Sequence, residues 1–209
     1  MGTADEVIID GNYSNSIILV NSVSQVKFFN LTFINGKSND YGGAIYTETA
    51  GEIKNSVFIS NQVKNGGTRK GGAIYINTAC TTTITGNYFE RNGGQASRGG
   101  AIYTDSTDTH LKLYGNVFHQ NYASDQGSSV FNSGFYDDVS GNWWALNGVG
   151  IPNQLKEYDR VGSSTDHSDS SPLVVSVSGD KNSYVGIKTS IKVSFTKDVS
   201  YYALEKILY

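Results

Sequence analysis

One pentapeptide, Gly-Gly-Ala-Ile-Tyr, is written three times in this chain and restricts the folds that the chain can adopt. The copies occupy residues 42–46, 71–75 and 99–103, so the steps between them are 29 and 28 residues. A degenerate fourth copy at residues 127–131 follows after another 28 residues. A fixed period of this size is typical of stacked supersecondary units, each of which buries its apolar face only against its neighbours.

A second motif, an aromatic residue followed three residues later by Asn, repeats in phase with the first. An aliphatic residue lies five positions before each aromatic residue. Extending the pattern backwards by one unit gives five consecutive units, roughly residues 7–147. The repeated apolar positions predict three columns of stacked side chains: Ile18, Ile45, Ile74, Ile102 and Val130; Phe28, Ile53, Ile84, Leu113 and Val139; and Phe33, Phe58, Phe89, Phe118 and Trp144.

Short strands and polar turns, without helical periodicity, predict an all-β fold. Strands of about four residues in units of about 28 suit a chain that winds helically and pairs each strand in parallel with its counterpart in the next unit. We therefore predict a parallel β-helix of about five coils, in which the paired glycines adopt backbone angles that a Cβ atom disfavours. The repeated asparagines are predicted to stack as an amide ladder and to adopt left-handed turns; they are Asn61, Asn92, Asn121 and Asn147.

The period ends near residue 151 and divides the chain into three parts. Residues 5–151 are predicted to form the β-helix, and residues 152–172 are a linker by composition. Residues 173–209 alternate as antiparallel strands do. They are predicted to form either part of an Ig-like sandwich or a β segment that caps the open end of the helix.

Composition argues against several classes of function. The net charge is −3, and the 16 basic residues form no stripe, so nucleic acid is not an expected partner. Cys80 is the single cysteine, which excludes an internal disulfide. No apolar run is long enough to span a membrane, so membrane insertion is not expected. The three histidines show no metal-ligand spacing, and a structural Ca²⁺ ion is possible without being indicated, so no cofactor is predicted.

Two short sequences match the acceptor motif for N-linked glycosylation. They are Asn12-Tyr13-Ser14 and Asn30-Leu31-Thr32. The chain is rich in Asn and Ser, so such matches also arise by chance, and Asn30 falls where a stacked column is expected.

A polar column follows the repeat tyrosines. Two positions after the repeat aromatic residue lie Glu48, Asn77, Asp105 and Ser133. Glu48 and Asp105 would be two coils apart, roughly 10 Å from the spacing of strands, which is at or beyond the wide end for the carboxylate pair of an inverting glycosidase. We interpret the column as a solvated corner, with an acid pair as the alternative, and predict no catalytic residue.

The repeat aromatic residues themselves are the better candidates for binding. Tyr46, Tyr75, Tyr103 and Phe131 lie on the face opposite the isoleucine column, because successive residues of a strand point to opposite faces. If the isoleucines point inwards, these rings form an outward stripe on which sugars or protein partners stack. The alternatives are that a loop covers the stripe, or that the alternation breaks at the glycines and the tyrosines belong to the core.

The repeats resemble those of two families of adhesins. Gly-Gly-Ala-Ile alternating with Phe-x-x-Asn is similar to the polymorphic outer membrane adhesins of chlamydiae and to adhesin-like surface proteins of methanogenic archaea. Asn142-Trp143-Trp144, followed by a Pro-containing stretch and an Ig-like strand pattern, looks more like the archaeal group, although Ala145 stands where that group typically has Gly. The resemblance covers residues 7–151 and implies a right-handed parallel β-helix exported to the cell surface and used for attachment.

Taken together, these observations predict an extracellular, non-catalytic adhesin-like module, as a fragment of a larger exported protein. Its expected partner is a glycan or protein of a host or microbial cell surface. Two alternatives stay open: a polysaccharide lyase or glycoside hydrolase built on the same fold, and a purely structural spacer.

Overall fold

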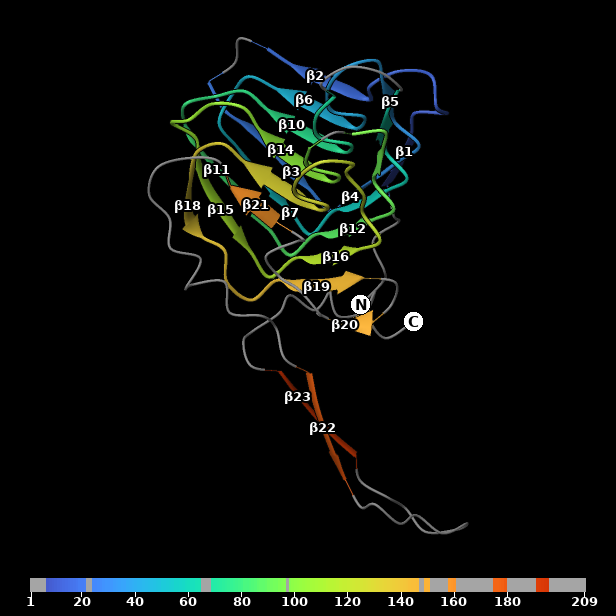
Figure 1. The fold of residues 1–209 in the computed structure, drawn as a ribbon, viewed down its shortest axis with the longest axis vertical. Coiled ribbons are helices and arrows are strands. Elements are labelled where there is room, and N and C mark those ends of the chain that lie inside the picture. Colours follow the sequence, from blue (N-terminus) through green and yellow to red (C-terminus); the bar gives the residue numbers. More distant parts are fainter. Residues whose placement is uncertain are drawn as a thin grey trace.

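The computed structural model describes residues 7–21, 24–64, 69–96, 98–146, 149–150, 158–160, 175–179 and 191–195. Within these ranges every regular element is a β-strand. Strands that are far apart in the sequence lie side by side in stacked sheets (Figure 1). The predicted all-β solenoid of about five coils is therefore confirmed.

Three long sheets form the faces of the solenoid, and each coil contributes one strand to each sheet. The first sheet consists of β1 (Val7–Asp10), β4 (Leu31–Ile34), β8 (Val57–Ile59), β12 (Tyr88–Glu90), β16 (Val117–His119), β19 (Trp143–Leu146) and β20 (Val149–Gly150). The second consists of β2 (Ile18–Val20), β6 (Ile45–Thr47), β10 (Ile74–Ile76), β14 (Ile102–Thr104), β17 (Val130–Asn132) and β21 (Tyr158–Arg160). The third consists of β3 (Val26–Phe29), β7 (Gly51–Lys54), β11 (Thr81–Thr85), β15 (His110–Tyr114) and β18 (Phe135–Asp138).

A small fourth sheet, which the sequence analysis did not predict, follows the first-sheet strands along the chain. It consists of three two-residue strands, β5 (Lys37–Ser38), β9 (Gln62–Val63) and β13 (Gly93–Gly94). Pairing in all four sheets is parallel except between β19 and β20. β21 lies within the range predicted as linker and pairs with β17.

The register of the sheets stacks the repeated residues as predicted. Ile45 pairs with Ile74, and Ile74 with Ile102. In the first sheet the rings of the aromatic column stack with centroids 4.6–5.0 Å apart, which is the spacing of neighbouring strands. Most members of the three columns are buried in one continuous core, and Ile18 and Phe28, at its first coil, pack against it partly exposed.

Two asparagine ladders connect the coils at the corners. In the predicted ladder, Asn61 Nδ2 donates to Asn92 Oδ1 at 3.1 Å and Asn92 Nδ2 to Asn121 Oδ1 at 3.0 Å, while Asn147 lies outside the described residues. A second ladder, which the sequence analysis did not predict, runs parallel to the first along the coils. Its members are Asn87, Asn116 and Asn142, joined by amide hydrogen bonds of 3.0 Å.

The left-handed residues are not the ladder asparagines, contrary to the prediction. Positive φ angles occur one residue earlier, at Ser60, Arg91 and Gln120. The preceding residue makes the turn, which leaves each asparagine side chain free to point into the ladder. The same arrangement precedes the second ladder, where Gly86, Gly115 and Gly141 have φ of 64–66°.

The paired glycines play two different roles. The first of each pair is left-handed, with φ between 58° and 67° at Gly42, Gly71, Gly99 and Gly127. The second is required by close packing: a Cβ on Gly72 would lie 2.2 Å from backbone atoms of both Gly93 and Gly100. At β6, β10 and β14 the chain therefore enters the second sheet through two positions that favour glycine, whereas Ser128 occupies the second position before β17.

The C-terminal part contains a two-stranded antiparallel sheet of β22 (Val175–Gly179) and β23 (Ile191–Phe195). The prediction of antiparallel strands here is confirmed. The other residues of the predicted Ig-like segment lie outside the described ranges.

Candidate functional site

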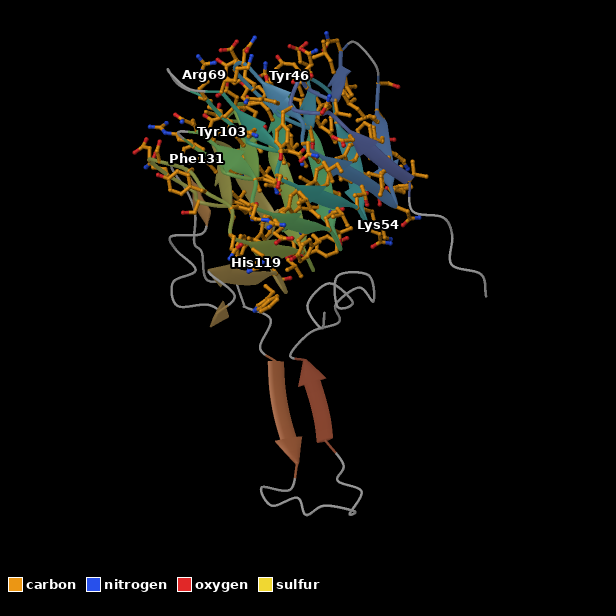
Figure 2. The ribbon with its side chains drawn as sticks, turned by 90° about the vertical axis from the view of Figure 1, so that its right-hand side faces the viewer. Tyr46, Lys54, Arg69, Tyr103, His119 and Phe131 are labelled. Carbon is orange, nitrogen blue, oxygen red and sulfur yellow. The ribbon has the colours of Figure 1, made fainter. Side chains whose placement is uncertain are left out.

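The repeat aromatic residues form a stack along the outside of the second sheet. Tyr46, Tyr75, Tyr103 and Phe131, here called the ring stack, pair in register on β6, β10, β14 and β17. Their ring centroids are 5.1–5.6 Å apart, and the planes of neighbouring rings are nearly parallel. Figure 2 places Tyr46, Tyr103 and Phe131 on one side of the solenoid, away from Lys54. Strand alternation therefore holds through the glycines, as the sequence indicated.

A second column of side chains covers the ring stack. It consists of the residues that precede each Gly-Gly pair, which are joined one to the next by isolated β-bridges: Tyr41, Lys70, Arg98 and Gln126.

Three of the covering side chains reach one coil forward. The Tyr41 ring stacks on Tyr75 at 4.5 Å. Lys70 Nζ lies 4.6 Å from the centre of the Tyr103 ring, and Arg98 Cζ lies 5.2 Å from that of Phe131. Cations over aromatic faces are attractive contacts, and they bury the rings under long aliphatic stems.

The covering column decides between the alternatives that the sequence left open. Tyr75 and Tyr103 are each 3% exposed and Phe131 is 1% exposed, whereas Tyr46 is partly exposed. The ring stack is therefore a covered stripe, with a small apolar cluster of its own outside the main core. A ligand on this face meets the edges of the rings and the polar side chains around them.

The polar column and the ring stack form one site, because the tyrosine hydroxyls reach the carboxylates. Tyr75 donates to Asp105 Oδ2 at 2.6 Å, and Tyr103 donates to Asp105 Oδ1 at 3.0 Å. Lys70 Nζ donates to the same Oδ1 at 2.8 Å. At the first coil of the site, Tyr46 donates to Glu48 Oε1 at 2.7 Å.

The electrostatics hold these groups in their ordinary charge states. Burial by itself would raise the pKa of Asp105, but the hydrogen bonds from Lys70 and the two hydroxyls outweigh it and lower the pKa. Burial would lower the pKa of Lys70, but its hydrogen bonds and electrostatic interactions with Asp105 and Tyr103 together outweigh that effect and raise the pKa. Burial, followed by the hydrogen bond to Asp105, raises the pKa of Tyr75 far above its usual value. A general base working near neutral pH needs the opposite shift for Lys or Tyr.

The polar column is in register from coil to coil. The backbone N–H of Asn77 donates to Thr47 O at 2.8 Å, and that of Asp105 donates to Ile76 O at 2.9 Å. Asn77 therefore stands one coil from Glu48 and one coil from Asp105, which separates the two carboxylates as expected. Glu48 and Asn77 are exposed, and Asp105 is partly exposed.

The outside of the first sheet carries a cluster that the sequence analysis missed. Tyr88 packs with Val57 and Val117 in a buried group, against partly buried Trp143. Tyr88 Oη lies 3.5 Å from His119 Nδ1, and that nitrogen lies 3.8 Å from Glu90 Oε1.

Burial and the nearby Glu90 raise the pKa of Tyr88 to about 12. The available signal was positional: Glu90 and His119 each follow the repeat phenylalanine directly, and they pair in register.

Across the described residues, no three His, Cys, Asp or Glu side chains gather closely enough to hold a metal ion. The part of the chain that the structure describes contains no helix long and apolar enough to cross a membrane.

The fold and the site define a class, the parallel β-solenoid repeat proteins, with a ladder of covered aromatic rings edged by polar side chains. Comparisons with protein-family models, curated proteins and solved structures find no match to this chain.

Proposed function

We propose that this chain is a non-catalytic, adhesin-like module of an extracellular cell surface, and that it binds a surface glycan along its polar column. The observation that carries the proposal is the exposed row of Glu48 and Asn77, continued by Asp105, beside stacked rings at one-coil intervals. Carboxylates accept and amides donate or accept the hydrogen bonds that sugar hydroxyls offer. The partly exposed ring of Tyr46 next to them provides an apolar contact of the kind that sugar rings make.

The rigidity of the row supports a binding role. Each side chain extends from a backbone fixed by parallel pairing on both sides, so little conformational freedom remains to be lost on binding. The interaction of Asp105 with Lys70 and two hydroxyls fixes the shape of the site in the same way. A long row of similar positions suits an extended ligand with a repeating structure.

The charge states favour binding over catalysis. The raised pKa values of Lys70 and Tyr75 keep the first protonated and the second neutral, so neither is poised to abstract a proton. Glu48 and Asp105 are separated by Asn77, and no second carboxylate adjoins either of them within the polar column.

A glycan-array screen of the purified chain, with and without Ca²⁺, tests the proposal. Each bound glycan is then assayed for release of reducing sugar. Asn77→Ala and Glu48→Gln are expected to weaken binding about tenfold or more, which corresponds to one or two lost hydrogen bonds to sugar hydroxyls. Lys112→Ala, an exposed change on the third sheet, is the matched control and is expected to bind like the wild type.

Other outcomes point to the other candidates. Release of sugar would overturn the non-catalytic assignment in favour of a polysaccharide lyase or hydrolase. Equal binding by all three variants would place the ligand elsewhere on the molecule. No binding to any glycan would overturn the carbohydrate assignment and leave a protein ligand or a structural spacer.

A further inference from the structure

The two glycosylation-type motifs lie on exposed turns of the first coil. Asn12 and Asn30 are exposed and adopt left-handed backbone conformations, with φ of 46° and 54°. Within the described residues, neither side-chain amide takes part in a hydrogen bond, and neither residue belongs to the core. No other Asn in the chain is followed two residues later by Ser or Thr.

The other repeated asparagines are of the opposite kind. The members of the two ladders are at most 4% exposed, and their amides bond to the next coil or to a buried carbonyl. A substituent on any of these nitrogens would break the ladder. Both acceptor motifs therefore fall on exposed asparagines outside the ladders, where a bulky group on the amide nitrogen breaks none of these hydrogen bonds.

Both motifs flank the same edge strand. Asn12 lies two residues after Asp10, the last residue of β1, and Asn30 directly precedes Leu31, which pairs with Val7 at the start of β1. The two asparagines therefore stand at opposite ends of β1, which is the end strand of the first sheet.

We propose that Asn12 and Asn30 are acceptors of N-linked glycans. The inference rests on the proposed extracellular function, because glycan transfer takes place during export. The donor is an oligosaccharide linked through phosphate to a polyprenyl lipid. The asparagine Nδ2 attacks the anomeric carbon, and a C–N bond forms as the C–O bond to the lipid phosphate breaks. The phosphate oxygen keeps the electron pair, and the amide proton leaves to a base of the transferase.

The two acceptor sites differ in when they can be modified. Ser14, the hydroxyl residue of the first motif, is exposed, and its Oγ donates to Asn12 O at 3.2 Å. Thr32, the hydroxyl residue of the second motif, is only 4% exposed, because it lies within β4. A transferase must reach the hydroxyl residue as well as the asparagine. Asn12 is therefore open to modification in the folded protein, whereas Asn30 must be modified before the first coil folds.

Mass spectrometry of the chain, secreted from a glycosylating host, tests the acceptor sites. Enzymatic glycan release in H₂¹⁸O marks each modified asparagine as labelled aspartate. Asn12→Gln and Asn30→Gln are each expected to remove one glycan, and Ser14→Thr to preserve the one on Asn12. Asn77, exposed but without the motif, is the unmodified control, and Ala79→Thr creates the motif there. A glycan on Asn77 in that variant, with Asn12 and Asn30 bare, would overturn the proposal.

This assay involves no glycan ligand, so a failed array screen leaves its result interpretable, and bare asparagines would not bear on ligand binding.

Discussion

Replacing Asn92, the central member of the first asparagine ladder, tests how much the ladder contributes to stability. Asn92 is 1% exposed and takes part in four side-chain hydrogen bonds. Its Oδ1 accepts from the backbone and side-chain nitrogens of Asn61, and its Nδ2 donates to Phe58 O and Asn121 Oδ1. Asn92→Ala removes all four at once and leaves their partners buried.

The expected loss follows from those four bonds. A typical hydrogen bond contributes about 1 kcal/mol net, and a buried group left without a partner costs about 1–3 kcal/mol. Asn61 Nδ2 and Asn121 Oδ1 each keep a second hydrogen bond, and Phe58 O lies in a strand ladder. The backbone N–H of Asn61, in contrast, loses its side-chain acceptor. We therefore expect Asn92→Ala to lower the free energy of unfolding by about 3–5 kcal/mol. Asn77→Ala, at an exposed position, is the matched control and is expected to change it by less than about 0.5 kcal/mol.

Asn92→Asp keeps the shape and separates hydrogen bonding from packing. A carboxylate there would face two acceptors, Phe58 O and Asn121 Oδ1, in a buried site, so the pKa of the new side chain must rise on folding. Below about pH 4 both states are protonated and the variant is most stable. Above that pH only the unfolded state ionises, so the free energy of unfolding should fall by about 1.4 kcal/mol per pH unit until the folded pKa is reached.

Urea unfolding followed by circular dichroism between pH 3 and pH 8 measures both effects. The aspartate variant also covers the case in which the alanine variant does not fold. If Asn92→Ala costs less than about 1 kcal/mol, or if Asn92→Asp shows the same pH dependence as the wild type, the ladder does not stabilise the stack as argued.

Three further predictions concern the coil turns and the titrating groups. Gly72→Ala should lower the free energy of unfolding by more than about 2 kcal/mol, because the new Cβ would lie 2.2 Å from backbone atoms. Gly115→Ala should lower it by only about 1 kcal/mol, because its Cβ would have no neighbour closer than 4.0 Å. Urea unfolding of the two variants measures the difference. Because folding lowers the pKa of Asp105, its carboxylate stabilises the fold at pH values above the ordinary pKa of 3.8, and this stabilisation is lost as the pH falls below that value. Asp105→Asn should thus be less stable than wild type at pH 7, by about 1 kcal/mol or less after solvent screening, with the difference shrinking in acid unfolding below about pH 4. The pKa of Tyr88, raised to about 12 from 10.0, means that stability falls as the pH rises between these values; Tyr88→Phe should reduce that fall in alkaline unfolding.

The fold could be predicted because the period fixes the register. Once residues 28 or 29 apart are placed on neighbouring strands, Ile45, Ile74 and Ile102 must stack, and the pairing of these three residues is the predicted one. The two-residue strands of the fourth sheet were missed because their sequences share no residue type. Lys37, Gln62 and Gly93 occupy equivalent places through backbone pairing alone.

The candidate site was only half predictable. Strand alternation placed the ring stack and the polar column correctly, but not the cover over the rings. Tyr41, Lys70 and Arg98 occupy equivalent positions but are three different residue types, so no repeated residue in the sequence indicates the column that they form. Their contacts depend on side chains that bend forward by one coil, and a sequence pattern does not specify that direction.

The parallel pairing of coils has a mechanical consequence. Hydrogen bonds between neighbouring coils run along the stacking axis, so a pull on an end strand loads its bonds one after another and peels it away. A load spread over a whole terminal coil is instead shared by three sheets and two amide ladders at once. The solenoid is therefore expected to resist far greater force when it is loaded across a whole end coil than when it is pulled by one end of its chain.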